Sequence, residues 1–315
     1  MTNEYKAENI GFVNELAVAR DKLDFGLLKD RIQKRGDTKK IADEYNINRV
    51  VLTRALNEDR ILSIFSKISR SKAQPLSTIK FDRELKLFAK YYNVHKLSVR
   101  QLYKKVKEWR KKIQYNPRLL LSSLQHDLII GSTIGDANIR QRNRNCNFRV
   151  GHTNKQTAYL LWKYNIIHEF ALSKPTWNIR KLNDRNIITL ELSTATHYAF
   201  NYYRKLFYKN RVKKITREIL NMLNPRSLAI WLCDDGSYDK KQGYIVFCTN
   251  AYSLKEHKIM KNYFEEIWNL SPTIGFRDKK YYYLRFKQED SKKLIEIVKP
   301  FILKSILYKI GEQNE

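Results

Sequence analysis

The sequence predicts an α+β protein that consists of two similar halves and an added all-helical N-terminal region. Two observations predict the halves: from Leu119 onward the order helix, two strands, helix, two strands, helix occurs twice, and an apolar helix that ends on an acid lies at the same place in each copy. A third observation separates the N-terminal region, because residues 1–116 read as nearly all helical.

The charge of the chain indicates a polyanionic partner. Its 315 residues include 61 lysine and arginine against 32 aspartate and glutamate side chains, which gives a formal charge of +29. Such an excess is typical of proteins that bind nucleic acid. Residues 1–116 alone carry +13 of this charge, so both parts of the chain could contact phosphate.

Composition argues against several other classes of protein. The N-terminal segment has early acids and no apolar stretch typical of a secretory signal, and no apolar run approaches the roughly 20 residues of a membrane span. Cys146, Cys233 and Cys248 show no C-x-x-C spacing, so we expect neither a disulfide framework nor a zinc site. We therefore expect a protein that is not secreted and that works in the cytoplasm or nucleoid, or in an organellar matrix.

The N-terminal region, residues 1–116, contains two candidate helix-turn-helix motifs. In residues 37–58, a short helix is followed by a turn and by a second helix whose Arg49 and Arg54 would enter a DNA major groove. In residues 84–112, a basic helix is expected after Ser98. The alternative for both segments is a plain helical hairpin with a solvated basic face. Between them, Gln74-Pro75 predicts a break in the helical pattern.

The two halves are predicted to occupy residues 117–224 and 225–315. Strands are expected at segments rich in β-branched and aromatic residues, which are 147–152, 177–182, 187–193, 244–250, 273–277 and 281–287. Helices are expected between them, for example at 155–172 and 253–268. A repeat of roughly 90 to 100 residues is typical of an internal duplication.

The two acid-terminated helices are the most specific feature. In residues 128–140, "LIIGSTIGDANIR", the apolar helix is expected to end on Asp136, and in residues 227–239, "SLAIWLCDDGSYD", on Asp234 and Asp235. Asp136 and Asp235 are 99 residues apart. If the helices pack about a pseudo-twofold axis, these two carboxylates emerge side by side. Small residues at four-residue spacing would allow the close approach, namely Gly131 with Gly135 and Ala229 with Cys233.

Carboxylates at the C-terminal end of a helix require a compensating positive charge. They lie at the unfavourable end of the helix dipole, so a duplicated pair is not expected for stability. Mg²⁺ prefers such hard oxygen ligands, and its charge offsets both the acids and the dipole. The alternative for Asp234 and Asp235 is an ordinary turn in which Gly236 is a left-handed C-cap.

These motifs resemble the two signature helices of the LAGLIDADG homing endonucleases, in the monomeric form that carries two copies. Residues 206–239 and 298–310 also resemble the segment that leads into the second motif and the C-terminal end of that family. The resemblance covers about residues 119–310. It implies two αββαββα halves whose saddle-shaped antiparallel sheets lie in the major groove, and metal-dependent cleavage of both DNA strands that leaves 3′ overhangs.

The resemblance also implies the roles of site residues. Asp136 and Asp235 correspond to the metal-binding acids, and Asp234 is a less favoured ligand. Ala137 departs from the family pattern, which has glycine there, so Asn138 is expected to supply a left-handed residue instead. The metal would be Mg²⁺, with Mn²⁺ able to substitute for it.

A catalytic lysine is implied in each half. The matching positions are Lys213, with Lys214 as a second choice, and Lys309, which lie 77 and 74 residues after Asp136 and Asp235. Near-equal spacing is expected of a duplicated site. The alternative is that these lysines only contact phosphate or solvent.

Strand side chains are expected to contact DNA. Alternation predicts that Tyr282, Leu284 and Phe286 face the core, and that the opposite face, together with corresponding positions in the first half, binds DNA. The predicted DNA-contacting residues of the sheets are Tyr281, Tyr283, Arg285, Lys287, Arg149, Asn178 and Arg180. Polar residues after the second strand of each half are further candidates for positions near the site, namely His152, Gln156, Thr249 and Asn250.

The resulting hypothesis is a site-specific homing endonuclease of the intron or intein type. Its partner would be double-stranded DNA, with intron RNA as a further partner. The rival hypothesis is an RNA maturase or a non-cleaving nucleic-acid-binding protein on the same scaffold. Retention of both acids favours cleavage, although a maturase could also keep them.

Overall fold

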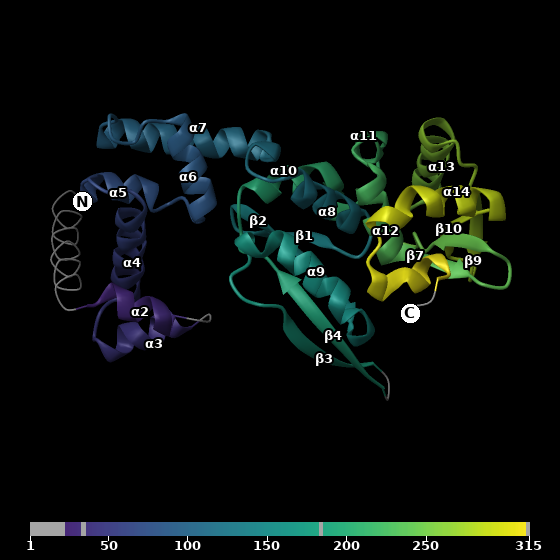
Figure 1. Ribbon diagram of the computed structural model, residues 1–315, viewed down its shortest axis with the longest axis horizontal. Coiled ribbons are helices and arrows are strands. Elements are labelled where there is room, and N and C mark those ends of the chain that lie inside the picture. The colour runs from purple at the N-terminus through teal and green to yellow at the C-terminus, as the bar shows by residue number, and fades with distance from the viewer. Residues whose placement is uncertain (1–22, 33–35, 183–184, 313–315) are drawn as a thin grey trace. The chain divides into compact units, whose positions relative to one another are not determined.

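The computed structural model describes residues 23–32, 36–182 and 185–312 (Figure 1). The chain forms two compact units, residues 1–112 and 113–315. Among the described residues, no helix has both the length and the apolar character needed to cross a membrane.

The first unit is helical throughout its described residues, as the sequence predicts. Its helices are α2 (Phe25–Arg31), α3 (Asp37–Glu44), α4 (Arg49–Ile64), α5 (Arg70–Leu76), α6 (Asp82–Tyr91) and α7 (Val99–Tyr115), which continues into the second unit. The break predicted at Gln74-Pro75 lies slightly later, because Pro75 is inside α5 and the helical pattern is interrupted between Leu76 and Asp82. Helix α5 ends one residue after Pro75, so proline interrupts little of the helical hydrogen bonding.

The second unit contains two copies of the same αββαββα arrangement. The first half comprises α8 (Ser123–Ile134), β1 (Asn138–Arg142), β2 (Asn145–Thr153), α9 (Thr157–Ile167), β3 (Thr176–Leu182), β4 (Arg185–Ser193) and α10 (Ala199–Phe207). The second half comprises α12 (Pro225–Asp235), β7 (Gly236–Asp239), β8 (Tyr244–Phe247), α13 (Leu254–Trp268), β9 (Thr273–Arg277), β10 (Tyr281–Phe286) and α14 (Gln288–Val298). Both sheets are antiparallel, with the orders β1-β2-β4-β3 and β7-β8-β10-β9. The predicted fold class is therefore confirmed.

Short elements join and complete the halves. The hairpin β5 (Tyr208–Lys209) and β6 (Val212–Lys213) and the helix α11 (Arg217–Leu220) connect them. The 3₁₀ segments are η1 (Pro117–Leu119), η2 (Asn154–Gln156), η3 (His168–Phe170), η4 (Lys299–Phe301) and η5 (Lys304–Ile310).

The helices α8 and α12 pack against each other at the centre of the second unit. A Cβ added to Gly131 would lie 2.3 Å from the backbone oxygen of Ser227 and 2.9 Å from Cβ of Ile230, and one added to Gly135 would lie 2.6 Å from Cβ of Asp234. The prediction for the two glycines is confirmed. The prediction that Cys233 faces the partner helix is wrong, because Cys233 packs in a cluster with Tyr159 and Ile306.

The start of this helix pair is held by capping and by polar contacts. Ser122 and Asn224 each form a capping box at the first turn of α8 and α12. The buried Asp127 of α8 accepts hydrogen bonds from the side chains of Asn224, at 2.8 Å, and Arg226, at 3.2 Å. The opposite ends of both helices are thereby aligned, and these ends carry the acids.

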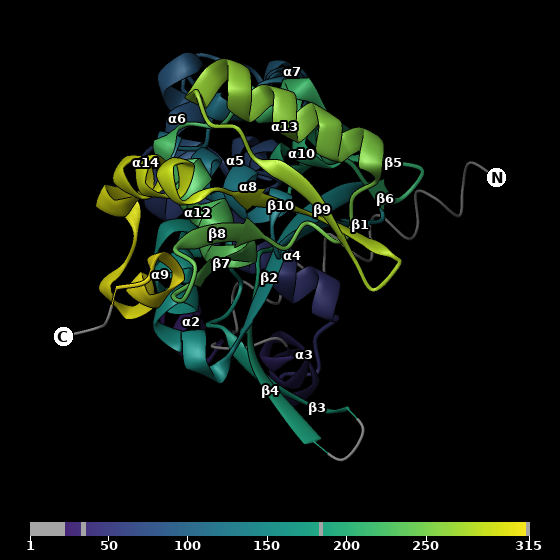
Figure 2. The same cartoon turned by 90° about the vertical axis from the view of Figure 1, so that its right-hand side faces the viewer.

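Each sheet buries one face beneath helices and leaves a polar face. In the first sheet the buried face includes Phe148 and Val150; in the second it includes Leu284 and Phe286, with Tyr282 half-buried beside His257. Figure 2 shows α13 lying along the strands of the second sheet. The predicted alternation in β10 is therefore confirmed, and the opposite face of each sheet remains available for other contacts.

Candidate active site

The two acids lie at corresponding but not identical helix ends. Asp235 is the last residue of α12, whereas α8 ends at Ile134 and Asp136 follows two residues later. Gly236 has φ −78°, so the alternative of a left-handed C-cap is wrong. Asn138 belongs to β1 and is not left-handed either, because the chain passes directly from helix to strand. Gly236 is needed for space instead, since an added Cβ would lie 2.4 Å from the backbone oxygen of Leu232.

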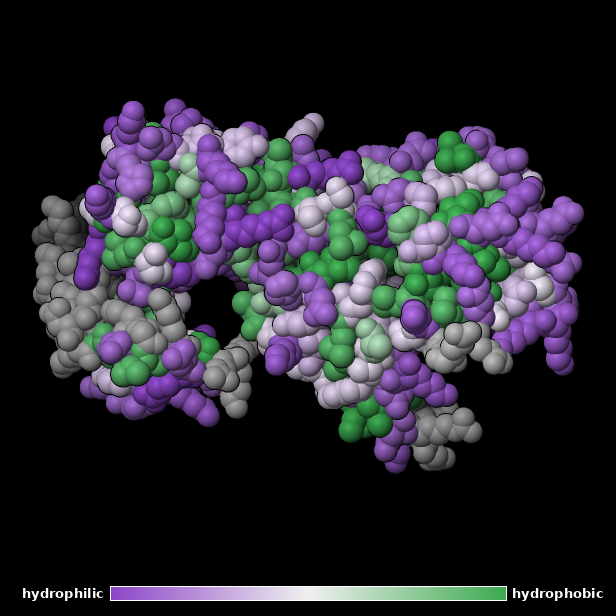
Figure 3. Space-filling model, in the orientation of Figure 1, coloured by the Kyte–Doolittle hydropathy of each residue, from purple (hydrophilic) through white to green (hydrophobic). Residues whose placement is uncertain are grey.

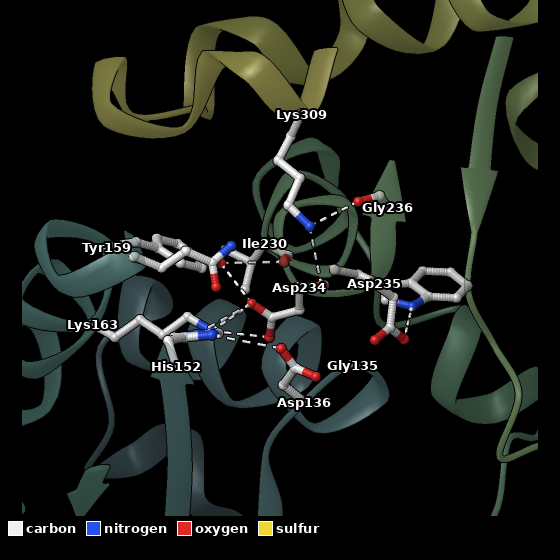
Figure 4. A network of polar contacts seen from close by, with 12 residues as sticks. Gly135, Asp136, His152, Tyr159, Lys163, Ile230, Asp234, Asp235, Gly236 and Lys309 are labelled. Atoms are coloured by element: carbon white, nitrogen blue, oxygen red, sulfur yellow. Dashed lines mark hydrogen bonds and ion pairs between the residues drawn. The ribbon is translucent and has the colours of Figure 1, made fainter. Parts of the chain in front are cut away.

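At the end of each of these two helices, one lysine donates hydrogen bonds to the backbone carbonyl oxygens on either side of the acid. Nζ of Lys213 donates to the carbonyl oxygens of Gly135 and Ala137, at 2.8 and 2.9 Å, which are the neighbours of Asp136 in the chain. Nζ of Lys309 donates to the carbonyl oxygens of Asp234 and Gly236, at 3.4 and 2.8 Å, which are the neighbours of Asp235 (Figure 4). Each half therefore supplies one acid flanked by two carbonyls that one lysine bridges.

The acid pair, Asp136 and Asp235, is held in an environment that disfavours negative charge. Limited hydration raises the pKa of Asp136 to about 6, with Asp234 adding to the effect, although 43% of the Asp136 side chain is exposed. Burial raises the pKa of Asp235 to about 8, and Asp136 is the next largest cause. Burial lowers the pKa of Lys213, against the influence of these acids. Such crowded carboxylates are suited to a cation, whose charge would offset their repulsion.

Asp234 has a different environment. Its side chain is fully buried, and its oxygens accept bonds from Nζ of Lys163, at 2.6 and 2.9 Å, and from the hydroxyl of Tyr159, at 2.9 Å. Figure 4 shows it turned toward Lys163, while Asp136 directs one oxygen toward His152 and the carboxylate of Asp235 points away from that lysine. Asp234 is therefore committed to an ion pair.

One cluster in the described residues has the composition of a metal site. Ligand atoms of Asp136, His152 and Asp234 lie within 4.8 Å of one another. Nδ1 of His152 is 3.5 Å from Asp136, and burial lowers its pKa to about 3, so the ring is neutral. Because Lys163 and Tyr159 already occupy the oxygens of Asp234, the accessible oxygens of the acid pair fit a hard divalent cation better than this cluster does.

The comparisons with known proteins identify the family. The sequence model of the LAGLIDADG DNA endonuclease family matches residues 126–294, which is more than half of the chain. The chain belongs to this family.

Individual relatives agree with that assignment. The chain is 31% identical over 198 residues to a probable intron-encoded endonuclease 1 of Wickerhamomyces canadensis, across 60% of this chain and 85% of that protein. It is 28% identical over 194 residues to the cytochrome b mRNA maturase bI2 of Debaryomyces hansenii, across 59% of this chain and 72% of the relative. The solved structure of the homing endonuclease I-WcaI bound to its DNA recognition sequence superposes with a TM-score of 0.57 at 27% identity, covering 66% of this chain and 92% of that one.

The first LAGLIDADG sheet has a basic polar face. Arg149 pairs in register with Asn138 and Ser193, and its guanidinium is bound by Glu191 on the same face. Asn178 is half-buried in β3; Arg180 belongs to the same strand, but its side chain lies outside the described residues. A hollow on this face is lined by Arg140, Arg142, Asn147, Arg149, Ser173, Lys174, Thr176, Glu191 and Ser193.

The second sheet alternates aromatic rings and cations on its polar face. Arg285 lies 5.5 Å from the ring centre of Tyr244, and Arg277 lies 5.9 Å from that of Tyr283. Tyr281 is half-buried on the same face. Lys287 is exposed but lies beyond the strand, at the start of α14, so it sits at the edge of this surface.

The remaining candidates differ in their surroundings. Gln156 donates to the Tyr308 hydroxyl at 2.9 Å, whereas Thr249 is buried against His257 at 2.7 Å, and Asn250 accepts from Arg277 at 3.3 Å. In α4, Arg49 is exposed, whereas Arg54 is half-buried and paired with Glu58.

The sequence reasoning missed Lys163 and Tyr159. Lys163 is the one charged residue of α9, "TAYLLWKYNII". A charged side chain in so apolar a helix seldom occurs without a buried partner, and this signal could have drawn attention to it.

Proposed function

We propose that this protein is a site-specific homing endonuclease that makes a metal-dependent double-strand cut at a long DNA target. The observation that carries the proposal is the duplicated helix end, in which each half supplies an acid and a lysine that bridges the carbonyls beside it. A double-strand cut requires two such sets, one for each scissile phosphate. Both sets belong to one chain, so a monomer suffices.

The acid pair would hold the metal. Asp136 and Asp235 offer hard carboxylate oxygens, and burial together with repulsion between neighbouring acids raises their pKa values, a cost that a divalent cation would offset. Mg²⁺ is the proposed ion, and Mn²⁺ is expected to replace it. When bound, the cation would neutralise charge that develops on the scissile phosphate.

The two lysines would stabilise the transition state, and the two sheets would bind the DNA target. Lys213 interacts with both Asp235 and Asp136, and Lys309 interacts with Asp136, so both ammonium groups lie near the acid pair, where they can stabilise charge on the phosphate in the transition state. The polar faces of the sheets carry arginine, asparagine and tyrosine, which can bind base edges and phosphates in the major groove. Arg149, Asn178, Tyr281, Tyr283 and Arg285 are the proposed contacts that the structure describes on these faces.

The test of this proposal uses Asp136→Asn and Asp235→Asn, with the fused flanks of any surrounding intron or intein as the candidate target. Each variant should lose double-strand cleavage in Mg²⁺ and retain target binding in a gel shift with Ca²⁺, because it removes a metal ligand and leaves the sheets intact. Normal cutting by both single variants would refute the assignment.

A maturase is the second candidate, because the relative from Debaryomyces hansenii is named as one. If the protein promotes splicing of its host intron RNA, and Asp136→Asn and Asp235→Asn leave this splicing activity unchanged, the protein is a maturase, either in addition to cleaving DNA or instead of it.

A further inference from the structure

The first unit, which the family match does not cover, contains an internal repeat. Residues 41–47, "IADEYNI", and residues 88–94, "FAKYYNV", are 47 positions apart and share Ala, Tyr and Asn at the same places, with an apolar residue at each end. Each segment closes a helix, α3 or α6, and is followed by a turn and a longer helix, α4 or α7. The repeat therefore spans two complete helix-turn-helix elements.

The longer helix of each element, α4 or α7, begins at a capping residue, and each element has its own set of buried apolar side chains. Asn48 accepts from the backbone of Val50 at 2.8 Å, and Ser98 caps α7 through Gln101. The first element buries a cluster of Leu23, Leu28, Ile41, Ala42, Val51, Leu52 and Ala55. In the second element, Trp109 contacts Phe88, and its indole donates to the buried carboxylate of Glu84 at 2.9 Å.

The exposed side of α7 is a basic stripe. We use this name for Arg100, Lys104, Lys107 and Lys111, which are exposed at the spacing i, i+4, i+7, i+11. The buried residues Leu102, Val106 and Trp109 follow the same spacing two positions later, which is about 200° around the helix. The stripe therefore lies opposite the core. In Figure 3, hydrophilic side chains project along the top of this unit, where Figure 1 places α7.

The stripe is available for a partner. Within the described part of the chain, none of its four residues forms an ion pair, whereas the neighbouring Lys105 is bound to Glu108 at 2.9 Å. Helix α7 carries seven basic residues and one acid, whereas α4 carries three basic residues and two acids. Charge complementarity therefore makes α7 the stronger site for a polyanion.

The two elements are fixed relative to each other by the loop between α5 and α6. Arg60 of α4 donates to the carbonyls of Ile79 and Lys80 and to Asp82, at 2.5, 2.9 and 2.7 Å. Arg110 of α7 donates to the carbonyl of Thr78 at 3.1 Å. A rigid pair of helix-turn-helix elements suits one continuous partner.

We propose that the first unit is a tandem helix-turn-helix module that binds double-stranded DNA, with the basic stripe of α7 making its main phosphate contacts. The major groove of B-DNA is about 12 Å wide and admits a helix. The deep, narrow major groove of A-form RNA does not, so the geometry favours DNA. This binding goes beyond the endonuclease site and requires no cleavage.

The test compares two full-length triple variants of equal charge. One is Lys104→Gln/Lys107→Gln/Lys111→Gln; the control is Lys255→Gln/Lys258→Gln/Lys292→Gln, which removes exposed lysines from α13 and α14. Binding of a fluorescent random-sequence duplex of about 30 base pairs is measured in EDTA, so that no cleavage occurs.

The stripe variant should show a slope of log K against log salt that is shallower by about 2.7, since each phosphate contact contributes about 0.9. The ratio of the binding constant of the unmodified protein to that of the stripe variant should therefore be roughly 40-fold smaller at 200 mM salt than at 50 mM salt. The control should keep the original slope. Equal slopes for the two variants would overturn the proposal. So would a stripe variant that loses binding to a structured RNA hairpin while it keeps its binding to the duplex.

Discussion

The buried ion pair between Lys163 and Asp234 offers a sharp test of what holds the two LAGLIDADG halves together. Both side chains are fully buried, one on α9 of the first half and the other on α12 of the second. Removing one partner of such a pair leaves an uncompensated buried charge. We expect this to lower the free energy of unfolding by about 3 to 5 kcal/mol. Lys163→Met therefore should destabilise the second unit strongly.

The expected size of the effect can be expressed as a melting temperature. For a unit of roughly 200 residues, 1 kcal/mol shifts Tm by about 2 to 4 °C, so Lys163→Met should lower Tm by roughly 6 to 20 °C. Differential scanning calorimetry of the full chain would measure this shift. Lys155→Met is the matched control, because Lys155 is exposed just before α9 and its loss should leave Tm nearly unchanged.

A double variant decides whether the charge or the packing is responsible. Lys163→Met/Asp234→Ala removes both charges, keeps the Cβ that packs on Gly135, and leaves the Tyr159 hydroxyl its second acceptor, the carbonyl of Ile230 at 3.2 Å. It should recover much of the lost stability. A double variant no more stable than Lys163→Met would contradict the reasoning.

Four further outcomes are expected. Lys213→Ala and Lys309→Ala should each slow cleavage by roughly a hundredfold or more and change target affinity far less; the opposite pattern would make both lysines simple phosphate contacts. Gly131→Ala should cost about 1 to 3 kcal/mol in urea unfolding, because its Cβ would lie 2.3 Å from a backbone oxygen, whereas Gly151→Ala should cost less, because its nearest neighbour would be Cγ of Glu191 at 3.2 Å. In EDTA, stability should fall as pH rises from about 6.5 to about 8, because folded Asp235, with a pKa of about 8, keeps a proton that the unfolded chain has released, whereas at lower pH His126 and His152, whose pKa values burial lowers to about 4 and about 3, oppose the acids. Saturating Ca²⁺ should remove this fall, and a stability that stays level or rises over this range in EDTA would contradict the raised pKa of Asp235. A chain that begins at Asn116 should stay folded and cut its target, with weaker binding and a shallower salt dependence; a truncated chain of equal affinity would assign residues 1–116 another role.

Much of this architecture could be predicted because duplication makes a pattern visible twice. One acid at a helix end is ambiguous, but two at repeat spacing, each followed by a lysine at near-equal distance, predict one site. The structure places Lys213 and Lys309 in equivalent contacts beside the acid pair. Their catalytic roles stay predictions.

Other features could not be predicted, for physical reasons. Strand β1 and strand β7 were not among the expected strands because their sequences, "NIRQR" and "GSYD", are mostly polar and directly follow a helix. They form strands because pairing with β2 and β8 satisfies their backbone groups. The partner of Lys163 was equally hidden, since 71 residues separate it from Asp234. Only the tertiary fold brings such charges together.

The contact between Asp234 and Gly135 has a consequence for the ancestry of the chain. The second half presents a carboxylate at the position where the first half presents no side chain. Two copies of the second half, joined as a symmetric dimer, would bring two aspartates into one buried space, and two copies of the first half would leave Lys163 without its acid. The halves have thus become complementary parts that cannot replace each other. Because their two sheets also carry different side chains on their polar faces, the two halves of a DNA target need not mirror each other.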